Sequence, residues 1–234
     1  MTDDREKNNQ LVKAKRASLQ KRASNIISRG LSDLALLDVE DAAIVDEEEI
    51  LSQAREWFEK GYKYDINKDY DNAIEAYTKA IALDPHYSDY NNRGIAYNKK
   101  RQYDRAIEDY NKAIALDPNY AKAYINRGVA YYYKGQYDRV IEDYNKAISI
   151  NPNDAFAHYI RGLAYYYKGQ YGRTIEDYNR AIQLDQNYAQ VYYERGLVYE
   201  KLGNKSMAIS DYRKACDLGL EIGCENLQRV LKQK

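Results

Sequence analysis

Residues 126–148 read NRGVAYYYKGQYDRVIEDYNKAI, and residues 160–182 read IRGLAYYYKGQYGRTIEDYNRAI. The two stretches lie 34 residues apart, and the same pattern continues on both sides of them. A period of this length with two short helical segments is typical of a solenoid, in which each repeat buries its apolar face against its neighbours. The sequence therefore predicts an all-α stack of helical hairpins with an extended surface for binding.

Five such units can be aligned, and every unit has a glycine at the same position. The units are residues 54–86, 87–120, 121–154, 155–188 and 189–222. The glycines are Gly61, Gly94, Gly128, Gly162 and Gly196. A glycine inside a helix costs about 1 kcal/mol relative to alanine, so five in register need a packing reason. We expect them to meet two columns of small residues in the second helix of each unit. These columns are Ala73, Ala106, Val140, Thr174 and Ala208, and Ala80, Ala113, Ala147, Ala181 and Ala215.

Large aromatic residues fill the positions between the small ones. Tyr124, Gly128 and Tyr131 are spaced i, i+4 and i+7, which places them on one side of an α-helix. Tyrosine also recurs in the second helices, and the chain contains 27 tyrosines in all. Asp-Pro or Asn-Pro pairs lie near the end of each of the first three units and predict the turns between units, because proline cannot continue a helix.

These columns resemble the tetratricopeptide repeat family. A glycine, two alanines, aromatic residues and a late proline at these spacings are that family's pattern, and the resemblance covers residues 54–222. It implies a right-handed α-solenoid of five helix-turn-helix repeats, with the first helix of each unit on the concave side. The fifth unit departs from the pattern at Lys205 and Leu220. Residues 223–234 are predicted to form a C-terminal capping helix over the last apolar face.

In each of the last four units an arginine directly precedes the glycine, and an aspartate lies 16 residues after that arginine. The pairs are Arg93 with Asp109, Arg127 with Asp143, Arg161 with Asp177, and Arg195 with Asp211. The first unit has Lys60 and Ala76 at these places, so acid and arginine are lost together. We predict an ion pair that joins the two helices of each unit. The alternative is two independent solvated charges, which would contribute about 0–1 kcal/mol.

A second apolar stripe runs beside the core stripe in the first helices of units three and four, and it reaches unit five. We call it the tyrosine face. Its residues are Ile125, Asn126, Val129, Tyr132, Tyr133, Phe156, Tyr159, Ile160, Leu163, Tyr166, Tyr167 and Tyr193. Such a run is more apolar than a solvated surface and predicts a groove for a peptide or short helix, with aromatic anchors. The alternative interpretation is that the rings stack on one another and thicken the core.

The resemblance also suggests a test for the family's carboxylate clamp, which grips chaperone C-terminal tails with Lys and Asn side chains. Starting from the first unit, the matching places are Phe58, Tyr62, Asn92, Lys122 and Asn126, of which two match the clamp. Starting from the second unit, they are Asn91, Ile95, Asn126, Phe156 and Ile160, of which one matches. The clustered cations that a carboxylate needs are missing, and this argues against a chaperone tail as the partner.

Composition excludes several other classes of function. The chain has 36 basic and 36 acidic residues, which argues against nucleic-acid binding. No apolar run reaches the roughly 20 residues of a transmembrane helix, and the acidic N-terminus does not resemble a secretory signal. We expect Cys216 and Cys224 to be buried reduced thiols, and the protein to be cytoplasmic. No residue cluster indicates catalysis, a metal or another cofactor.

Residues 1–53 lie outside the repeats. Residues 5–29 contain eight basic residues and one acid, whereas residues 30–52 contain eight acids and no base. Ile27, Leu31 and Leu34 have helical spacing near the junction of the two blocks. The segment could fold over the first repeat, occupy the chain's own groove until a partner displaces it, bind an outside partner or an anionic membrane, or stay disordered.

The repeats favour a protein-interaction scaffold or adaptor that holds a peptide or short helix in the groove. The alternative function is a structural unit that self-associates within a larger assembly.

Overall fold

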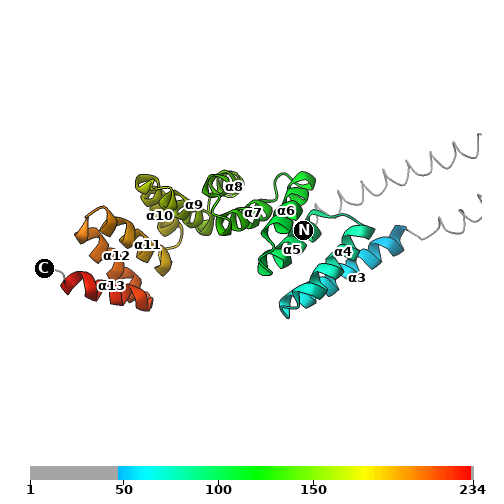
Figure 1. Cartoon of the computed structure of the whole chain (residues 1–234), viewed down its shortest axis with the longest axis horizontal. Helices are drawn as coiled ribbons and strands as arrows, with labels where there is room; N and C mark the ends of the chain where they lie inside the picture. The colour runs from blue at the N-terminus through cyan, green and yellow to red at the C-terminus, as the bar shows by residue number, and fades with distance from the viewer. Residues whose placement is uncertain (1–46, 233–234) are drawn as a thin grey trace, which may run out of the picture. The chain divides into compact units, whose positions relative to one another are not determined.

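The computed structural model describes residues 47–232, and these form eleven helices and no strand. Figure 1 shows the helices following one another in series. The first helices of the five units are α3 (Glu47–Ile66), α5 (Tyr87–Lys99), α7 (Ala121–Tyr133), α9 (Ala155–Tyr167) and α11 (Ala189–Lys201). The second helices are α4 (Tyr70–Leu83), α6 (Tyr103–Leu116), α8 (Tyr137–Ile150), α10 (Tyr171–Leu184) and α12 (Lys205–Asp217), and α13 (Glu221–Lys232) follows them.

The architecture is the expected all-α solenoid. From α4 to α13 each helix packs on the next one along the chain, and Phe58 of α3 contacts Tyr77 of α4 with ring centroids 5.7 Å apart. α3 begins seven residues before the predicted start of the first unit at residue 54. The predictions for residues 1–46, including the amphipathic stretch at Ile27, lie outside the described residues.

The glycine column packs differently from the prediction. A Cβ atom added to Gly128 would lie 2.6 Å from Cε2 of Tyr144, and the glycines of the other four units face the matching tyrosines. Tyr144 is fully buried, as are those tyrosines. The expected contact of small residue with small residue is therefore wrong, because the space beside each glycine is filled by a ring of the second helix.

This packing predicts opposite effects for two glycine-to-alanine changes. Gly128→Ala should lower the free energy of unfolding by about 1–3 kcal/mol, because the buried Tyr144 ring has no room to move. Gly172 lies in the first turn of α10, and an added Cβ would meet nothing within 4 Å. Gly172→Ala should therefore raise the free energy of unfolding by about 0.5–1 kcal/mol. Urea titrations would measure the change in the free energy of unfolding for both variants. Changes of the same sign would contradict the packing described for Gly128.

The predicted arginine–aspartate pairs are confirmed. In the third unit, Arg127 donates two hydrogen bonds to Asp143, from Nε to Oδ2 at 2.9 Å and from Nη2 to Oδ1 at 2.6 Å. Its Nη1 also donates to Oδ1 of Asn111, in the second helix of the preceding unit, at 2.5 Å. Arg161 and Arg195 repeat the whole pattern with Asn145 and Asn179. This three-way contact, which we call the arginine staple, ties each hairpin together and also to the preceding hairpin.

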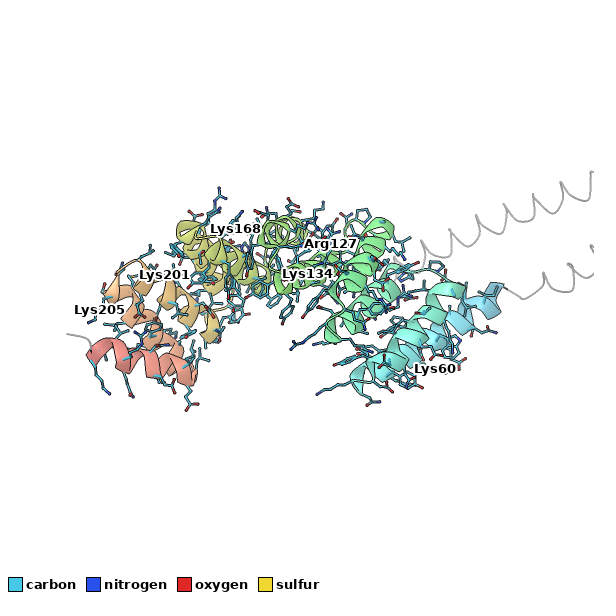
Figure 2. All side chains as sticks on the ribbon, viewed as in Figure 1. Lys60, Arg127, Lys134, Lys168, Lys201 and Lys205 are labelled. Carbon is cyan, nitrogen blue, oxygen red and sulfur yellow. A yellow bond between two sulfur atoms is a disulfide. The ribbon has the colours of Figure 1, made fainter. Side chains whose placement is uncertain are left out.

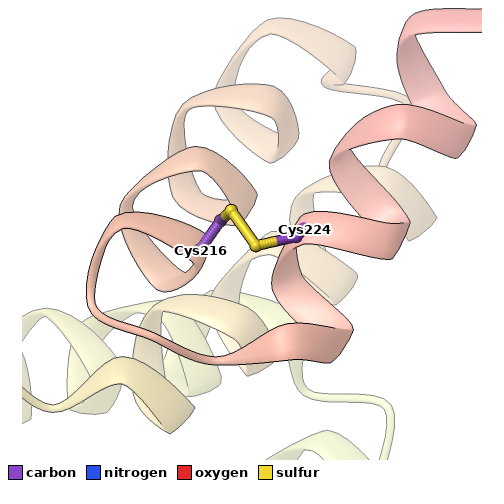
Figure 3. Close-up of a disulfide and its surroundings, with 2 residues drawn as sticks. All are labelled: Cys216 and Cys224. Atoms are coloured by element: carbon purple, nitrogen blue, oxygen red, sulfur yellow. A yellow bond between two sulfur atoms is a disulfide. The ribbon is translucent and has the colours of Figure 1, made fainter.

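The two cysteines form a disulfide, which corrects the expectation of reduced thiols. Cys216 in the last turn of α12 is bonded to Cys224 in α13, and their Cα atoms lie 4.6 Å apart (Figure 3). Val230 of α13 is buried in the same cluster as Tyr212, and Arg229 forms two hydrogen bonds with Glu200. α13 therefore covers the last repeat as predicted, but with a covalent link that the sequence argument missed.

Removing the disulfide should loosen α13 selectively. The bond closes a short loop with a sequence separation of 8 residues, and loop-closure entropy for that length corresponds to about 2–3 kcal/mol. A Cys216→Ser, Cys224→Ser variant should show faster amide hydrogen exchange in α13 than the oxidised protein, with α5 to α8 unchanged. Treating that variant with a reductant is the control and should change nothing. Equal exchange in α13 for variant and oxidised protein would contradict the prediction.

Candidate functional site

The tyrosine face lies on three first helices, α7, α9 and α11. Ile125, Val129 and Tyr132 are spaced along α7, and α9 repeats the spacing from Tyr159 onward. Helical periodicity therefore turns them to the same side of each helix. The ring of Tyr132 in α7 contacts the ring of Tyr167 in α9, so the stripes of these two first helices adjoin.

None of the twelve side chains of the tyrosine face is fully buried. Tyr133 is 62% exposed, Tyr167 is 51% exposed and Phe156 is 40% exposed. The others are partly buried, namely Ile125, Asn126, Val129, Tyr132, Tyr159, Ile160, Leu163, Tyr166 and Tyr193. Packing within the described chain thus leaves apolar area uncovered on this face.

Several of these rings also stack on one another, as the alternative interpretation held. Tyr132 contacts Tyr167 with ring centroids 5.8 Å apart, and Tyr167 stacks on Tyr137 at 4.9 Å with an interplanar angle of 4°. Tyr133 stacks on Tyr103 at 5.5 Å. Tyr103 and Tyr137 begin the second helices α6 and α8, and the predicted face did not include them. The stacks fix the positions of the rings but leave one side of Tyr133 and Tyr167 accessible.

Unit five places a lysine where units three and four have a tyrosine. Lys201 stands at the position of Tyr133 and Tyr167, and its Nζ lies 5.3 Å from the ring centroid of Tyr166 and 5.6 Å from that of Tyr171. A cation over a tyrosine ring is attracted by the negative face of the π system. The rings at this end of the tyrosine face are therefore placed to contact a cation as well as an apolar group.

Ion pairs link successive units next to the stacked rings. Lys134 pairs with Asp104 and Lys168 pairs with Asp138, and both lysines are labelled in Figure 2. Each lysine follows the end of a first helix, and each aspartate lies in the first turn of the preceding second helix. The next junction has Gly172 in place of the acid. Sequence reasoning missed these pairs because their partners are about 30 residues apart.

Asn126 is fixed by a neighbouring unit. Its side-chain amide donates to Oδ1 of Asn91 at 2.9 Å, and Asn91 is only 2% exposed. Asn126 therefore holds two first helices together.

Among residues 47–232 no group of His, Cys, Asp or Glu side chains could hold a metal ion, and no helix is long and apolar enough to cross a membrane.

Family comparisons agree with this geometry. Models described as tetratricopeptide repeat match residues 54–87, 121–154, 143–176 and 189–218, and a model described as TPR repeat matches residues 94–135 and 162–203. Together the matches cover more than half of the chain. This chain belongs to the tetratricopeptide repeat family. A search of curated proteins found no match to it.

Solved tetratricopeptide repeat structures have the same fold. A crystal structure of MamA protein is 29% identical, covers 71% of this chain and 91% of its own, and has a TM-score of 0.66. Another crystal structure of MamA is 30% identical over 68% of this chain and 93% of its own, with a TM-score of 0.64. YrrB, described as a TPR protein with an unusual peptide-binding site, is 19% identical over 74% of this chain and 90% of its own, with a TM-score of 0.64. At that identity the likeness to YrrB shows the fold alone.

The tyrosine face of these repeats ends at a carboxylate. Glu194 of α11 accepts a hydrogen bond from Nε2 of Gln190 at 2.8 Å and forms no ion pair among the described residues. Burial raises the pKa of Glu194 above its ordinary range. Burial also raises the pKa values of Tyr132 and Tyr159, with smaller contributions from nearby groups, so both hydroxyls stay protonated at neutral pH.

Proposed function

We propose that this tetratricopeptide repeat protein is an interaction scaffold that binds a peptide or short helix along the tyrosine face of units three and four. The observation that carries the proposal is the accessible apolar area on α7 and α9, where Tyr133 and Tyr167 remain more than half exposed. Apolar surface that is contiguous over two units is typical of an interaction site.

The geometry suits binding because the anchors are held in place before a partner arrives. The ring stacks with Tyr103 and Tyr137 limit the side-chain freedom of Tyr133 and Tyr167, so less conformational entropy is lost on binding. Large, rigid aromatic side chains commonly carry most of the energy of an interface. The name given to YrrB supports peptide binding by this fold, although it describes that protein and not this one.

Replacing two anchors should weaken binding without unfolding the repeats. A pull-down with the intact protein, read by mass spectrometry, would first supply a partner peptide. The Tyr133→Ala, Tyr167→Ala variant should then bind that peptide at least about 30-fold more weakly, because one interface anchor is worth about 2 kcal/mol or more. Tyr62→Ala is the matched control, since Tyr62 is 53% exposed on α3 and lies away from units three and four. Unchanged affinity in the double variant, with helix content retained, would refute the proposed site.

Self-association is the alternative function, and the observation that favours it is the exposed apolar side chains of α13. Ile222 is 43% exposed and Leu231 is 54% exposed on this last described helix. A second copy that packed there would bury them. Light scattering over a concentration series distinguishes the two functions, because a scaffold for peptides keeps the mass of a monomer and an assembly unit does not. We propose no catalytic role.

The cytoplasmic location stays a prediction, and the disulfide is the observation against it. Disulfides persist mainly in oxidising compartments, so the thiol argument for the cytosol no longer holds. Trapping free thiols with a maleimide in intact cells would decide the matter. Labelling of Cys216 and Cys224 would support the cytosol.

A further inference from the structure

An open hollow with an excess of positive charge lies at the turn between α5 and α6. It is lined by Arg101, Gln102, Tyr103, Asp104, Arg105 and Lys134, and we call it the cationic hollow. Three of these side chains are cations and one is a carboxylate, so the lining has two positive charges in excess. Lys134, which is labelled in Figure 2, follows the end of α7 and belongs to the next unit.

The two arginines of the cationic hollow are not paired with an acid. Arg101 is exposed, and its side chain forms no ion pair or hydrogen bond with residues 47–232. Arg105 donates from Nη1 to Oε1 of Gln102 at 3.3 Å, and its guanidinium lies 5.7 Å from the ring centroid of Tyr97. Neither of these contacts supplies a negative charge. The guanidinium groups therefore keep donors and charge for an anion.

Arg101 has a backbone conformation that arginine normally avoids. Its φ is 59°, in the left-handed region, where the Cβ atom comes too close to the following carbonyl oxygen. Units three, four and five place a glycine in this turn, and Gly135 of unit three has a φ of 69°. The repeat thus has a residue that removes the strain, and unit two does not use it. Strain of this kind is retained where a side chain has a functional role.

The corresponding turn of unit three lacks only the arginine. Arg139 and Lys168 stand at the places of Arg105 and Lys134, and Lys168 pairs with Asp138 as Lys134 pairs with Asp104. Gly135 replaces Arg101, so one positive charge in excess remains there instead of two.

The corresponding turn of unit one has the strain but not the charge. Lys68 has a φ of 61°, and Lys100 stands at the place of Lys134. Asn72 replaces Arg105, and Asp69 and Asp71 balance the two lysines. Unit two is therefore the repeat that combines a left-handed cation with unpaired guanidinium groups.

The cationic hollow adjoins the tyrosine face. Tyr103 lines the hollow, and its ring stacks on that of Tyr133 with centroids 5.5 Å apart and an interplanar angle of 11°. Tyr133 is 62% exposed and is one of the two anchors of the proposed peptide site. A peptide that packs on Tyr133 therefore passes next to the hollow.

We propose that the cationic hollow binds a phosphorylated side chain of the peptide that occupies the tyrosine face. The proposal rests on the proposed function and adds the chemistry of the partner. A phosphate monoester carries about −1.5 to −2 charges at pH 7 and matches the two positive charges in excess, whereas a carboxylate would leave one of them unmatched. The planar guanidinium of arginine also donates two parallel hydrogen bonds to phosphate oxygens.

Titrations of the full-length protein followed by NMR test the proposal. The probes are inorganic phosphate, phenyl phosphate and benzoate, each compared with sodium chloride at equal ionic strength. Both phosphates should shift the amide signals of residues 101–105 and 134. Phenyl phosphate should bind more tightly than inorganic phosphate, because its ring also contacts Tyr133. Benzoate should bind about tenfold more weakly than phenyl phosphate, because it has one charge and two oxygens for the arginines.

Arg101→Gly should weaken the binding of both phosphates about tenfold, which corresponds to the loss of one charge-assisted hydrogen bond. The same variant should raise the melting temperature by about 2–4 °C, because glycine removes the left-handed strain. Lys68→Gly is the matched control. It removes the same strain in unit one, so it should raise the melting temperature similarly and leave phosphate affinity unchanged. A purely structural role for Arg101 would change the melting temperature alone.

Gly135→Arg tests whether the site can be moved to unit three. An added Cβ at Gly135 meets nothing within 4 Å, so an arginine side chain has room there. In the Arg101→Gly background this change should restore phosphate binding, and the shifted signals should now be those of residues 135–139 and 168. Phosphate affinity that stays as weak as in Arg101→Gly alone would overturn the role given to the arginine.

The outcomes separate this inference from the proposed function. Unchanged phosphate affinity in Arg101→Gly, or shifts that sodium chloride reproduces, would overturn the phosphate site and leave the tyrosine face standing. Unchanged peptide affinity in Tyr133→Ala, Tyr167→Ala, with phosphate binding retained, would overturn the proposed function and keep the hollow as a phosphate site. Benzoate that bound as tightly as phenyl phosphate would overturn the choice of phosphate. Arg101-dependent binding of an oligouridine would identify nucleic acid as the source of the phosphate and overturn the peptide.

Discussion

Asp143→Asn should lower the free energy of unfolding by about 3–5 kcal/mol. The aspartate is almost fully buried and accepts two of the three hydrogen bonds that the Arg127 guanidinium donates, so its replacement leaves the buried positive charge without a carboxylate partner. The loss should also weaken the contact between units, because the same arginine contacts Asn111 of the preceding hairpin. Urea denaturation followed by circular dichroism would measure the effect.

Asp138→Asn, on the same helix, is the matched control. Asp138 pairs with Lys168, but its side chain is 77% exposed, so the pair should contribute only about 0–1 kcal/mol. A double-mutant cycle with Arg127→Met then isolates the coupling energy of the buried pair. A loss for Asp143→Asn no larger than that for Asp138→Asn would show that the staple does not stabilise the repeats.

Asp89→Ala should raise the free energy of unfolding by about 2 kcal/mol at pH 7. Asp89 is 6% exposed, and the same position holds Ala123, Ala157 and Val191 in the next three units. Burial raises the pKa of Asp89 to about 6, with a smaller contribution from Asp84 and an opposing hydrogen bond from Ser88. A shift of about two pH units corresponds to about 3 kcal/mol, and the favourable position in the first turn of α5 offsets up to about 1 kcal/mol of it.

The gain from Asp89→Ala should depend on pH. Because the pKa of Asp89 is higher in the folded state than in the unfolded state, the folded protein binds more protons between about pH 4 and pH 6, and its stability falls as pH rises through that window. The variant loses this dependence, so its advantage should be largest at pH 7 and small at pH 4. Glu108→Ala, which removes an exposed acid on α6, should give no such gain. A gain that does not change with pH would contradict the assignment.

Spacing along the chain predicted the arginine–aspartate contact that recurs within the last four units, but not the contacts that recur between units. The arginine–aspartate pair of the staple could be found because Arg127 and Asp143 recur together 16 residues apart, and because their counterparts are missing from the first unit, whereas the contact with Asn111 was not predicted. The partner of the glycines was wrong for a related reason. The glycine, alanine and tyrosine columns all share the same period, so the sequence could not say whether Gly128 meets an alanine or the ring of Tyr144.

The candidate site was predicted less completely. Helical spacing identified Tyr132 and Tyr166 as partly accessible, but the stacks with Tyr103 and Tyr137 depend on how one hairpin packs on the next. The missing partner of Glu194 could not be recognised either, because a charged residue on a helix is usually solvated. The disulfide was missed because two cysteines eight residues apart across a turn come within bonding distance only when α13 folds back on α12.

The sequence by itself determined the number of units, the helical hairpin and the side of each helix that carries the core, because a period of 33 or 34 residues repeats the same local physics five times. Only the tertiary structure decided which groups meet between units and which remain unpaired. Those outcomes depend on the distance and rotation between neighbouring hairpins, and they set the burial and the charge balance of Glu194, Asp89 and the exposed tyrosines.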